Sequence, residues 1–323
     1  MRKSRLVALG LFICTLSALS VTIRLVKHME NFILFAAHVT LPAHTPPRTV
    51  VSISSFGRRV FHMAECLDSI FSQSYAPDRI IVSIPKTYRK GEGSWCDPRG
   101  TDCVSDPTHY DESPESIVRW FSNYMASNYT TQTNNHSVFE FPNLTLQFLD
   151  LDWGPATKAL GALLLEHDPD TVIITLDDDL VYNRETVHWL ASHIGHNMAL
   201  SFGCEMLDHL HNDFQSFTTR ELGNLFATTP RVCKGWLVGW TAVAYRVGHF
   251  AHDVWTYLDR LPRGCFYNDD IWLSGYIAKQ GVLKVYAPMV MDHVKHWRDT
   301  ELSLSTIEGG RKRYGIPCAE ALF

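Results

Sequence analysis

The chain has 323 residues, of which 46% are hydrophobic and 20% are charged. This length and composition allow a large buried core, in one large domain or two small ones. The formal net charge of −5 at pH 7 and the sequence pI near 6.3 show no basic signature, so nucleic acid is not an expected partner.

The first 26 residues predict a membrane anchor. Residues 1–5 (MRKSR) are basic, and residues 6–23 carry no charge. As a helix, the uncharged segment would be about 27 Å long, close to the roughly 30 Å hydrocarbon core of a bilayer. Arg24 can extend its charged end toward the bilayer surface, which lengthens the segment to residue 26. The basic leader directs the N-terminus to the cytosol.

We therefore expect a cytoplasmic tail over residues 1–5, a signal anchor over 6–26, a stem over 27–48 and a lumenal domain over 49–323. This is the organisation of a single-pass type II protein of the Golgi or endoplasmic reticulum membrane. The alternative is a signal peptide cleaved near Ala18-Leu19-Ser20, which would give a secreted protein.

Two further patterns agree with exposure to the lumen. Residues 128–145 contain three acceptor triplets for N-glycosylation, at Asn128, Asn135 and Asn143. Seven cysteines follow the anchor, and Cys96 and Cys103, which flank a turn-rich segment, are the expected disulfide pair. No CxxC pair occurs, so a zinc site is not expected.

Apolar runs and helical periodicity alternate from Thr49 onward. Strands are predicted over residues 49–55, 79–85, 144–150 and 171–176. Helices are predicted over 60–74, from Pro114 with Ser113 as N-cap, over 154–168 and from Asn183. In the first of these helices the expected buried face comprises Val60, Met63, Ala64, Leu67, Ile70 and Phe71.

The C-terminal half shows a less regular pattern. Residues 236–246 predict one buried strand. Residues 268–281 predict a helix that Asn268 caps and Gly281 ends, with Asp269 and Asp270 in its first turn. Residues 283–291 predict a last strand, which runs toward His293 and His296.

Strands that alternate with helices predict an α/β fold with right-handed crossovers and a mostly parallel, Rossmann-like central sheet. In such sheets ligands bind beyond the carboxyl ends of the strands. Polar loops follow several strands at that edge, so we expect a ligand site there. The loop residues that we expect to face a bound nucleotide are Ser54, Phe56, Arg58, Asp152, Lys158 and Asp178.

Three consecutive aspartates, Asp177 to Asp179, end the strand at 171–176. Two unpaired carboxylates about 4 Å apart repel by about 4 kcal/mol at an effective dielectric of 20, so something cationic is expected among them. In an extended chain Asp177 and Asp179 project to one side and Asp178 to the other. Oxygen ligands favour a hard cation such as Mn²⁺ or Mg²⁺. The alternative is an acidic turn without a metal.

A second acidic pair, Asp269 and Asp270, could supply a general base for an attacking hydroxyl, although acids also cap helices. His293 is the candidate third metal ligand, with His296 as its alternative. Arg58 and Lys158 are candidate phosphate or nucleotide contacts, and Asp152 a candidate contact for a ribose or sugar hydroxyl.

Together these segments resemble the glycosyltransferases of the GT-A fold, in which a DxD motif binds a divalent cation and the diphosphate of a nucleotide sugar. The resemblance lies in residues 50–85, 152–164 and 173–183, and residues 268–281 are similar in placement to the acidic motif of β-1,3-galactosyltransferase-like enzymes. It covers about residues 49–297, and it implies a nucleotide-binding half over about 49–183 and an acceptor-binding half over about 184–300. It implies Asp177 and Asp179 as metal ligands completed by His293, and Asp270 or Asp269 as the base.

The sequence thus predicts a metal-dependent glycosyltransferase that moves a sugar from a UDP- or GDP-sugar to a hydroxyl of a glycan or glycoconjugate. A carboxylate base would give inversion at the anomeric carbon. Without a base near that carbon, retention becomes possible. Two other classes stay open: a catalytically silent member of the fold that acts as a lectin or partner protein, and a metal-dependent phosphoester hydrolase.

Overall fold

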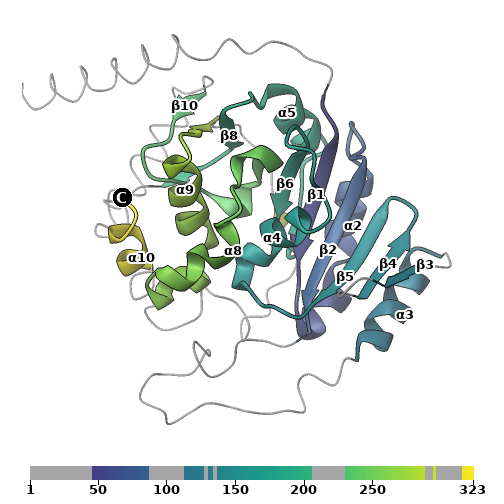
Figure 1. Cartoon of the computed structure of the whole chain (residues 1–323). Coiled ribbons are helices and arrows are strands. Elements are labelled where there is room, and N and C mark those ends of the chain that lie inside the picture. Colours follow the sequence, from purple (N-terminus) through teal and green to yellow (C-terminus); the bar gives the residue numbers. More distant parts are fainter. Residues whose placement is uncertain are drawn as a thin grey trace, which may run out of the picture.

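The computed structural model describes residues 46–86, 113–126, 130–133, 137–205, 230–287, 294–295 and 315–323 (Figure 1). Several sequence predictions lie outside these residues: the tail, the anchor, most of the stem, the Cys96–Cys103 pair, the acceptor triplets at Asn128 and Asn135, and both His293 and His296. In the described segments, no helix is long and apolar enough to cross a bilayer.

The core of the molecule is a ten-stranded sheet with the order β10-β13-β8-β12-β6-β1-β2-β5-β4-β3. Seven of these described strands run in one direction, and β12, β10 and β4 run against them. The expected mostly parallel α/β sheet is therefore confirmed. The strands are β1 (Thr49–Ser54), β2 (Arg79–Pro85), β3 (Thr130–Thr133), β4 (Ser137–Phe141), β5 (Leu144–Leu149), β6 (Val172–Leu176), β8 (Met198–Ser201), β10 (Arg231–Val232), β12 (Val243–Arg246) and β13 (Leu283–Tyr286).

Helices cover both faces of this sheet, which gives three layers (Figure 1). Successive residues of β1 alternate between two cores: Val51 and Ile53 pack with one, and Val50 packs with the other. The first core includes α2 (Ala64–Phe71), α3 (Pro114–Tyr124) and α5 (Thr186–His193). The second includes α4 (Thr157–Leu163), α8 (Val254–Tyr257), α9 (Asp269–Lys279) and α10 (Ile316–Glu320).

Smaller elements complete the described segments. Short antiparallel pairs join β7 (Leu180–Val181) to β14 (Val294–Lys295) and β9 (Cys204–Glu205) to β11 (Trp236–Leu237). The 3-10 helices are η1 (Gly57–His62), η3 (Gly154–Ala156), η4 (Gly239–Thr241), η5 (Val247–His249), η6 (Leu258–Arg260) and η7 (Arg263–Tyr267).

Several sequence predictions agree with this structure. The four predicted N-terminal strands correspond to β1, β2, β5 and β6 within a residue of their expected ends. Helix α3 begins at Pro114, and its N-cap Ser113 accepts a hydrogen bond from the Ser116 amide at 3.3 Å. Val60, Met63, Leu67 and Ile70 are buried.

Others are wrong. The predicted helix over 60–74 divides into η1 and α2, and Phe71 is 38% exposed instead of buried. The helix expected from Asn183 begins at Thr186. Hairpin β3–β4 was not predicted, because a TTQTNN run is typical of a loop. Asn268 occupies the N-cap of α9, but its side chain donates to the Gly264 carbonyl and makes no capping bond.

The strand predicted over 236–246 is also wrong in one respect that bears on the site. Helix η4 and a residue of positive φ, Ala242 (+80°), interrupt it between β11 and β12. A run of apolar residues cannot reveal such a break, since burial alone is compatible with either conformation.

Among the described cysteines, two disulfides join distant segments, Cys204–Cys233 and Cys265–Cys318, and Cys66 is a buried free thiol. Neither pair was predicted, since cysteine spacing does not define connectivity. The first disulfide ties β9 to the loop before β11. The second ties η7, which leads into α9, to α10.

Candidate functional site

Acidic side chains from two distant parts of the chain meet at one edge of the sheet. Asp177 follows the carboxyl end of β6, and the chain then turns at Asp178 and Asp179 before β7. Helix α4 brings Lys158 to the same place, and α9 brings Asp269 in its first turn. The predicted convergence of polar groups at this edge is confirmed for these residues.

Asp178 faces the interior. Its Oδ2 accepts hydrogen bonds from Ser55 Oγ at 2.6 Å and Arg59 Nε at 3.1 Å, and Arg59 makes a further short ion pair with Oδ1. Both side chains are largely buried. Burial opposes a charge on Arg59, but the attraction of Asp178 outweighs it, so the pKa of Arg59 is raised. This carboxylate is fully occupied by groups of the protein itself.

Lys158 joins the two acidic clusters. Its ammonium Nζ lies 2.7 Å from Asp177 Oδ1 and 3.1 Å from Asp269 Oδ2, and the residue is 5% exposed. Burial disfavours the charge, but attraction to Asp177, Asp269 and Asp270 outweighs burial and raises the pKa of Lys158. The lysine therefore stays protonated and neutralises acids from both halves of the chain.

Asp270 is held differently. Its Oδ2 accepts a hydrogen bond from the Gly239 amide at 2.8 Å. A β-carbon at position 239 would overlap Asp270 Oδ1 and lie 3.3 Å from Lys158 Nζ, so glycine is what allows this close approach. Burial, and then the charge of Asp269, raise the pKa of Asp270 well above its usual range, although Lys158 opposes the shift. A carboxylate with a raised pKa accepts a proton more readily than an exposed one, as a general base must.

The cation that three consecutive aspartates require is supplied at least in part by the protein. Lys158 binds Asp177, and Arg59 lies 3.5 Å from Asp179 Oδ2 in addition to its contacts with Asp178. The alternation of an extended chain does not apply to the aspartates, because the chain turns at Asp178.

These residues do not by themselves fit a divalent metal ion. Asp177 and Asp179 are oxygen donors of the right chemistry, but both already contact a protein cation. In the part of the chain that the structure describes, no group of three or more His, Cys, Asp or Glu side chains could hold a metal ion. The third predicted ligand, His293, lies outside that part. The metal site stays a prediction.

The remaining predicted residues lie around the same edge. Ser54 ends β1, and Phe56 precedes η1, where the guanidinium carbon of Arg59 lies 5.3 Å from the centre of its ring. Arg58 lies in η1, and its side chain is outside the description. Asp152 is buried, and its Oδ1 accepts a hydrogen bond from the Gly154 amide at 2.8 Å. Their roles in nucleotide binding stay predictions.

Sequence reasoning missed Arg59, Ser55 and Gly239. Arg58 and Arg59 are adjacent, and only the turn of η1 decides which one reaches Asp178. Gly239 lies in the run that was predicted as a strand. A glycine inside an apparent strand can mark a close backbone approach, and this signal could have indicated it.

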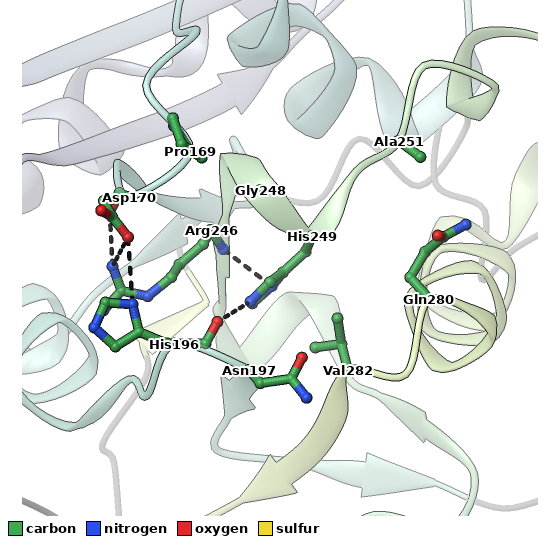
Figure 2. A pocket seen from close by; sticks show the side chains of 10 residues that line it. All are labelled: Pro169, Asp170, His196, Asn197, Arg246, Gly248, His249, Ala251, Gln280 and Val282. Carbon is green, nitrogen blue, oxygen red and sulfur yellow. Dashed lines mark hydrogen bonds and ion pairs between the residues drawn. The ribbon is translucent and has the colours of Figure 1, made fainter.

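A separate pocket of about 290 Å³ lies at the opposite edge, by the amino end of β6 (Figure 2). Arg246 there donates to the carbonyls of Asp170, Gly195 and Ile194, and His249 bonds the His196 carbonyl. Burial is the main cause that lowers the pKa of His249 to about 4. Because Arg246 and His249 hydrogen-bond to the surrounding backbone, these side chains connect neighbouring segments of the fold.

No protein-family model matches this sequence, and no curated protein matches it. Among solved structures, S. aureus TarS in complex with UDP-GlcNAc is similar at 18% identity over 49% of this chain and 35% of that chain, with a TM-score of 0.28. An active-site mutant of LgtC is similar at 9% identity over 73% and 70%, with a TM-score of 0.39. A mycobacterial protein is similar at 12% identity over 83% and 75%, with a TM-score of 0.37. With TM-scores this low, these similarities do not assign a function to the chain.

Proposed function

We propose that this chain is a glycosyltransferase that moves a sugar from a UDP- or GDP-sugar to a hydroxyl of a glycan or glycoconjugate. The observation that carries the proposal is the meeting of Asp177 with Asp269 and Asp270 through Lys158 at the carboxyl edge of the sheet. This edge is where α/β sheets bind ligands, and the resemblance of residues 49–297 to GT-A enzymes implies the same place.

Asp270 is the proposed base. The acceptor hydroxyl donates its proton to the Asp270 carboxylate while its oxygen forms a bond to the anomeric carbon of the donor sugar. The bond from that carbon to the diphosphate breaks, and the nucleoside diphosphate leaves with the electron pair. A single displacement of this kind inverts the anomeric carbon. Asp269 stays paired with Lys158 and holds the charge of the site in balance.

The donor would lie over the carboxyl ends of β1, β5 and β6, with Ser54, Phe56 and Asp152 as candidate contacts for its nucleoside. We also propose that the enzyme requires Mn²⁺ or Mg²⁺. The described residues do not complete a metal site, so the further ligands would be His293 and the phosphate oxygens of the donor. No chemical step is assigned to the metal.

We propose further that the domain lies in the lumen of the Golgi or endoplasmic reticulum, anchored by residues 6–26. The two disulfides support an oxidising compartment, since such bonds are rare in the cytosol.

The test uses the full chain, expressed in cells with a secretory pathway and purified in mild detergent. It is incubated with UDP- and GDP-sugars in the presence of Mn²⁺, Mg²⁺ or EDTA, and nucleotide release is measured. We expect release from one donor, lost in the Asp177→Ala/Asp179→Ala variant and kept in Glu320→Gln, which removes an exposed acid on α10. If no donor stabilises the chain against heating and none is turned over, the proposal is wrong.

One observation favours a second candidate, the catalytically silent protein. Arg59 and Lys158 already balance the aspartates, so the cluster could be stable without a donor or metal. Donor or glycan binding without turnover under all three metal conditions would identify that candidate. The described residues offer no group of metal ligands that would favour a phosphoester hydrolase.

A further inference from the structure

We propose that Trp240 is the surface on which the terminal pyranose ring of the acceptor stacks, so that the acceptor hydroxyl belongs to a sugar and not to a polypeptide side chain. This inference rests on the proposed function and adds to it the class of acceptor and the residue that selects it.

Trp240 lies next to the proposed base. It follows Gly239 in η4, and the Gly239 amide donates to Asp270 Oδ2 at 2.8 Å. Consecutive Cα atoms are about 3.8 Å apart, so the indole is attached to the backbone within one residue of the group that holds the carboxylate. A base must lie within hydrogen-bond reach of the proton that it removes. The ring that carries the reacting hydroxyl must therefore lie close to this same turn.

Trp240 also differs from other tryptophans of the described chain. It is 38% exposed, whereas Trp153, Trp236 and Trp272 are 5%, 3% and 0% exposed. A large aromatic side chain that reaches solvent beside a polar site is typical of a binding surface, because its face accepts apolar contacts while its N–H can meet a polar group. Pyranoses offer such a contact, since one face of the ring presents C–H groups.

The backbone around Trp240 is firmly held. Val238 O accepts hydrogen bonds from Thr241 Oγ1 at 2.7 Å and from Ser201 Oγ at 3.2 Å. Ala242 takes a φ of +80°, a strained conformation for a residue with a β-carbon. Strain of this kind persists where the surrounding structure imposes it, often at binding sites. The turn therefore holds the attachment point of the indole in place relative to Asp270.

The first experiment measures glycan binding apart from catalysis. Saturation-transfer NMR is recorded on the full chain with the methyl glycosides of galactose, glucose, N-acetylglucosamine and mannose. We expect at least one glycoside to receive saturation at the C–H groups of one ring face, with a loss of most of the signal in Trp240→Ala and partial retention in Trp240→Phe. Phe71→Ala, which removes an equally exposed aromatic beside Tyr124, is the control and should keep the signal.

The second experiment measures turnover. In Trp240→Ala the KM for the acceptor should rise about tenfold or more, as for truncation of a tryptophan in a binding centre, whereas the control variant Phe71→Ala should keep the wild-type KM and kcat. Equal binding of the glycosides by wild type and Trp240→Ala, or no binding by either, would overturn the inference. If the wild type binds glycosides through Trp240 but transfers no sugar, the proposed function is wrong and the sugar-binding surface stands.

Discussion

Two carboxylates at the same edge of the sheet, the buried Asp178 and the partly buried Asp270, are held in opposite ways. Asp178 accepts hydrogen bonds from Ser55 Oγ and from the Arg59 guanidinium, so a cation and several donors match its charge. Asp270 accepts a hydrogen bond from one backbone amide, and the charge of a single lysine, Lys158, attracts Asp177, Asp269 and Asp270 together. As a result the pKa of Asp270 is raised by burial and by Asp269.

This difference separates an acid with structural contacts from the acid that we propose as the base. A buried carboxylate whose charge is matched by a cation and by several hydrogen-bond donors stabilises the fold. A carboxylate that is buried with its charge only partly matched binds a proton more readily, which a general base requires. Proximity to the same ligand-binding edge therefore does not by itself make an acid catalytic.

The largest expected effect comes from Lys158, on which both clusters depend. Lys158→Met leaves Asp177 and Asp269 without their shared cation and should lower the free energy of unfolding by about 3–5 kcal/mol, the usual cost of unpairing a buried charge. Chemical denaturation would measure it. Adding Asp269→Asn should recover part of the loss, and a double variant no more stable than the single one would contradict the shared pairing.

Asparagine at position 178 should also destabilise the protein. Asp178→Asn removes the charge that balances the largely buried Arg59, at a cost of about 3 kcal/mol in the free energy of unfolding. Thermal unfolding would report it. An unchanged midpoint would mean that the Arg59 pair contributes nothing to stability.

The same substitution at position 270 should instead raise the free energy of unfolding. Asp270→Asn removes a carboxylate that burial disfavours and can still accept the Gly239 hydrogen bond, so the variant should be more stable than the wild type by about 1 kcal/mol at neutral pH. If Asp178→Asn and Asp270→Asn change the free energy of unfolding in the same direction, the two acids are not held in opposite ways.

The pH dependence sharpens this comparison further. Because the pKa of Asp270 is raised on folding, the folded state binds more protons, and its stability falls as pH rises from the unfolded value of about 3.9 through the folded value. The stability advantage of Asp270→Asn over the wild type should therefore grow with pH across that window. Thermal midpoints of both proteins over a pH series would show this, and a constant difference would argue against a raised pKa.

Much of the fold, and part of the site, could be predicted from the sequence. Short apolar runs such as residues 171–176 identify buried strands, and their carboxyl ends locate Asp177 and Lys158 at one edge before any contact is known. Asp269 and Asp270 could be singled out as an acidic pair in the first turn of a predicted helix. All of these depend on local pattern and on the general geometry of parallel sheets.

What the sequence could not provide are contacts between distant segments. Nothing local distinguishes Arg59 from Arg58, or shows that Lys158 neutralises Asp269 across 111 residues of chain. The break at η4 lies where Gly239 meets Asp270, which is also a distant contact. The charge of each acid in the folded protein is set by these contacts, and its chemical role follows from them.

The most direct test of the central claim is the rate of sugar transfer by Asp270→Asn with the donor and acceptor that support turnover by the wild type. Donor affinity is measured on the same preparation. General-base catalysis contributes a factor of roughly 10²–10⁴, so kcat should fall by about that factor while donor affinity and fold are unchanged. Wild-type turnover by Asp270→Asn would contradict the assignment of Asp270 as the base and the distinction between the two acids on which it rests.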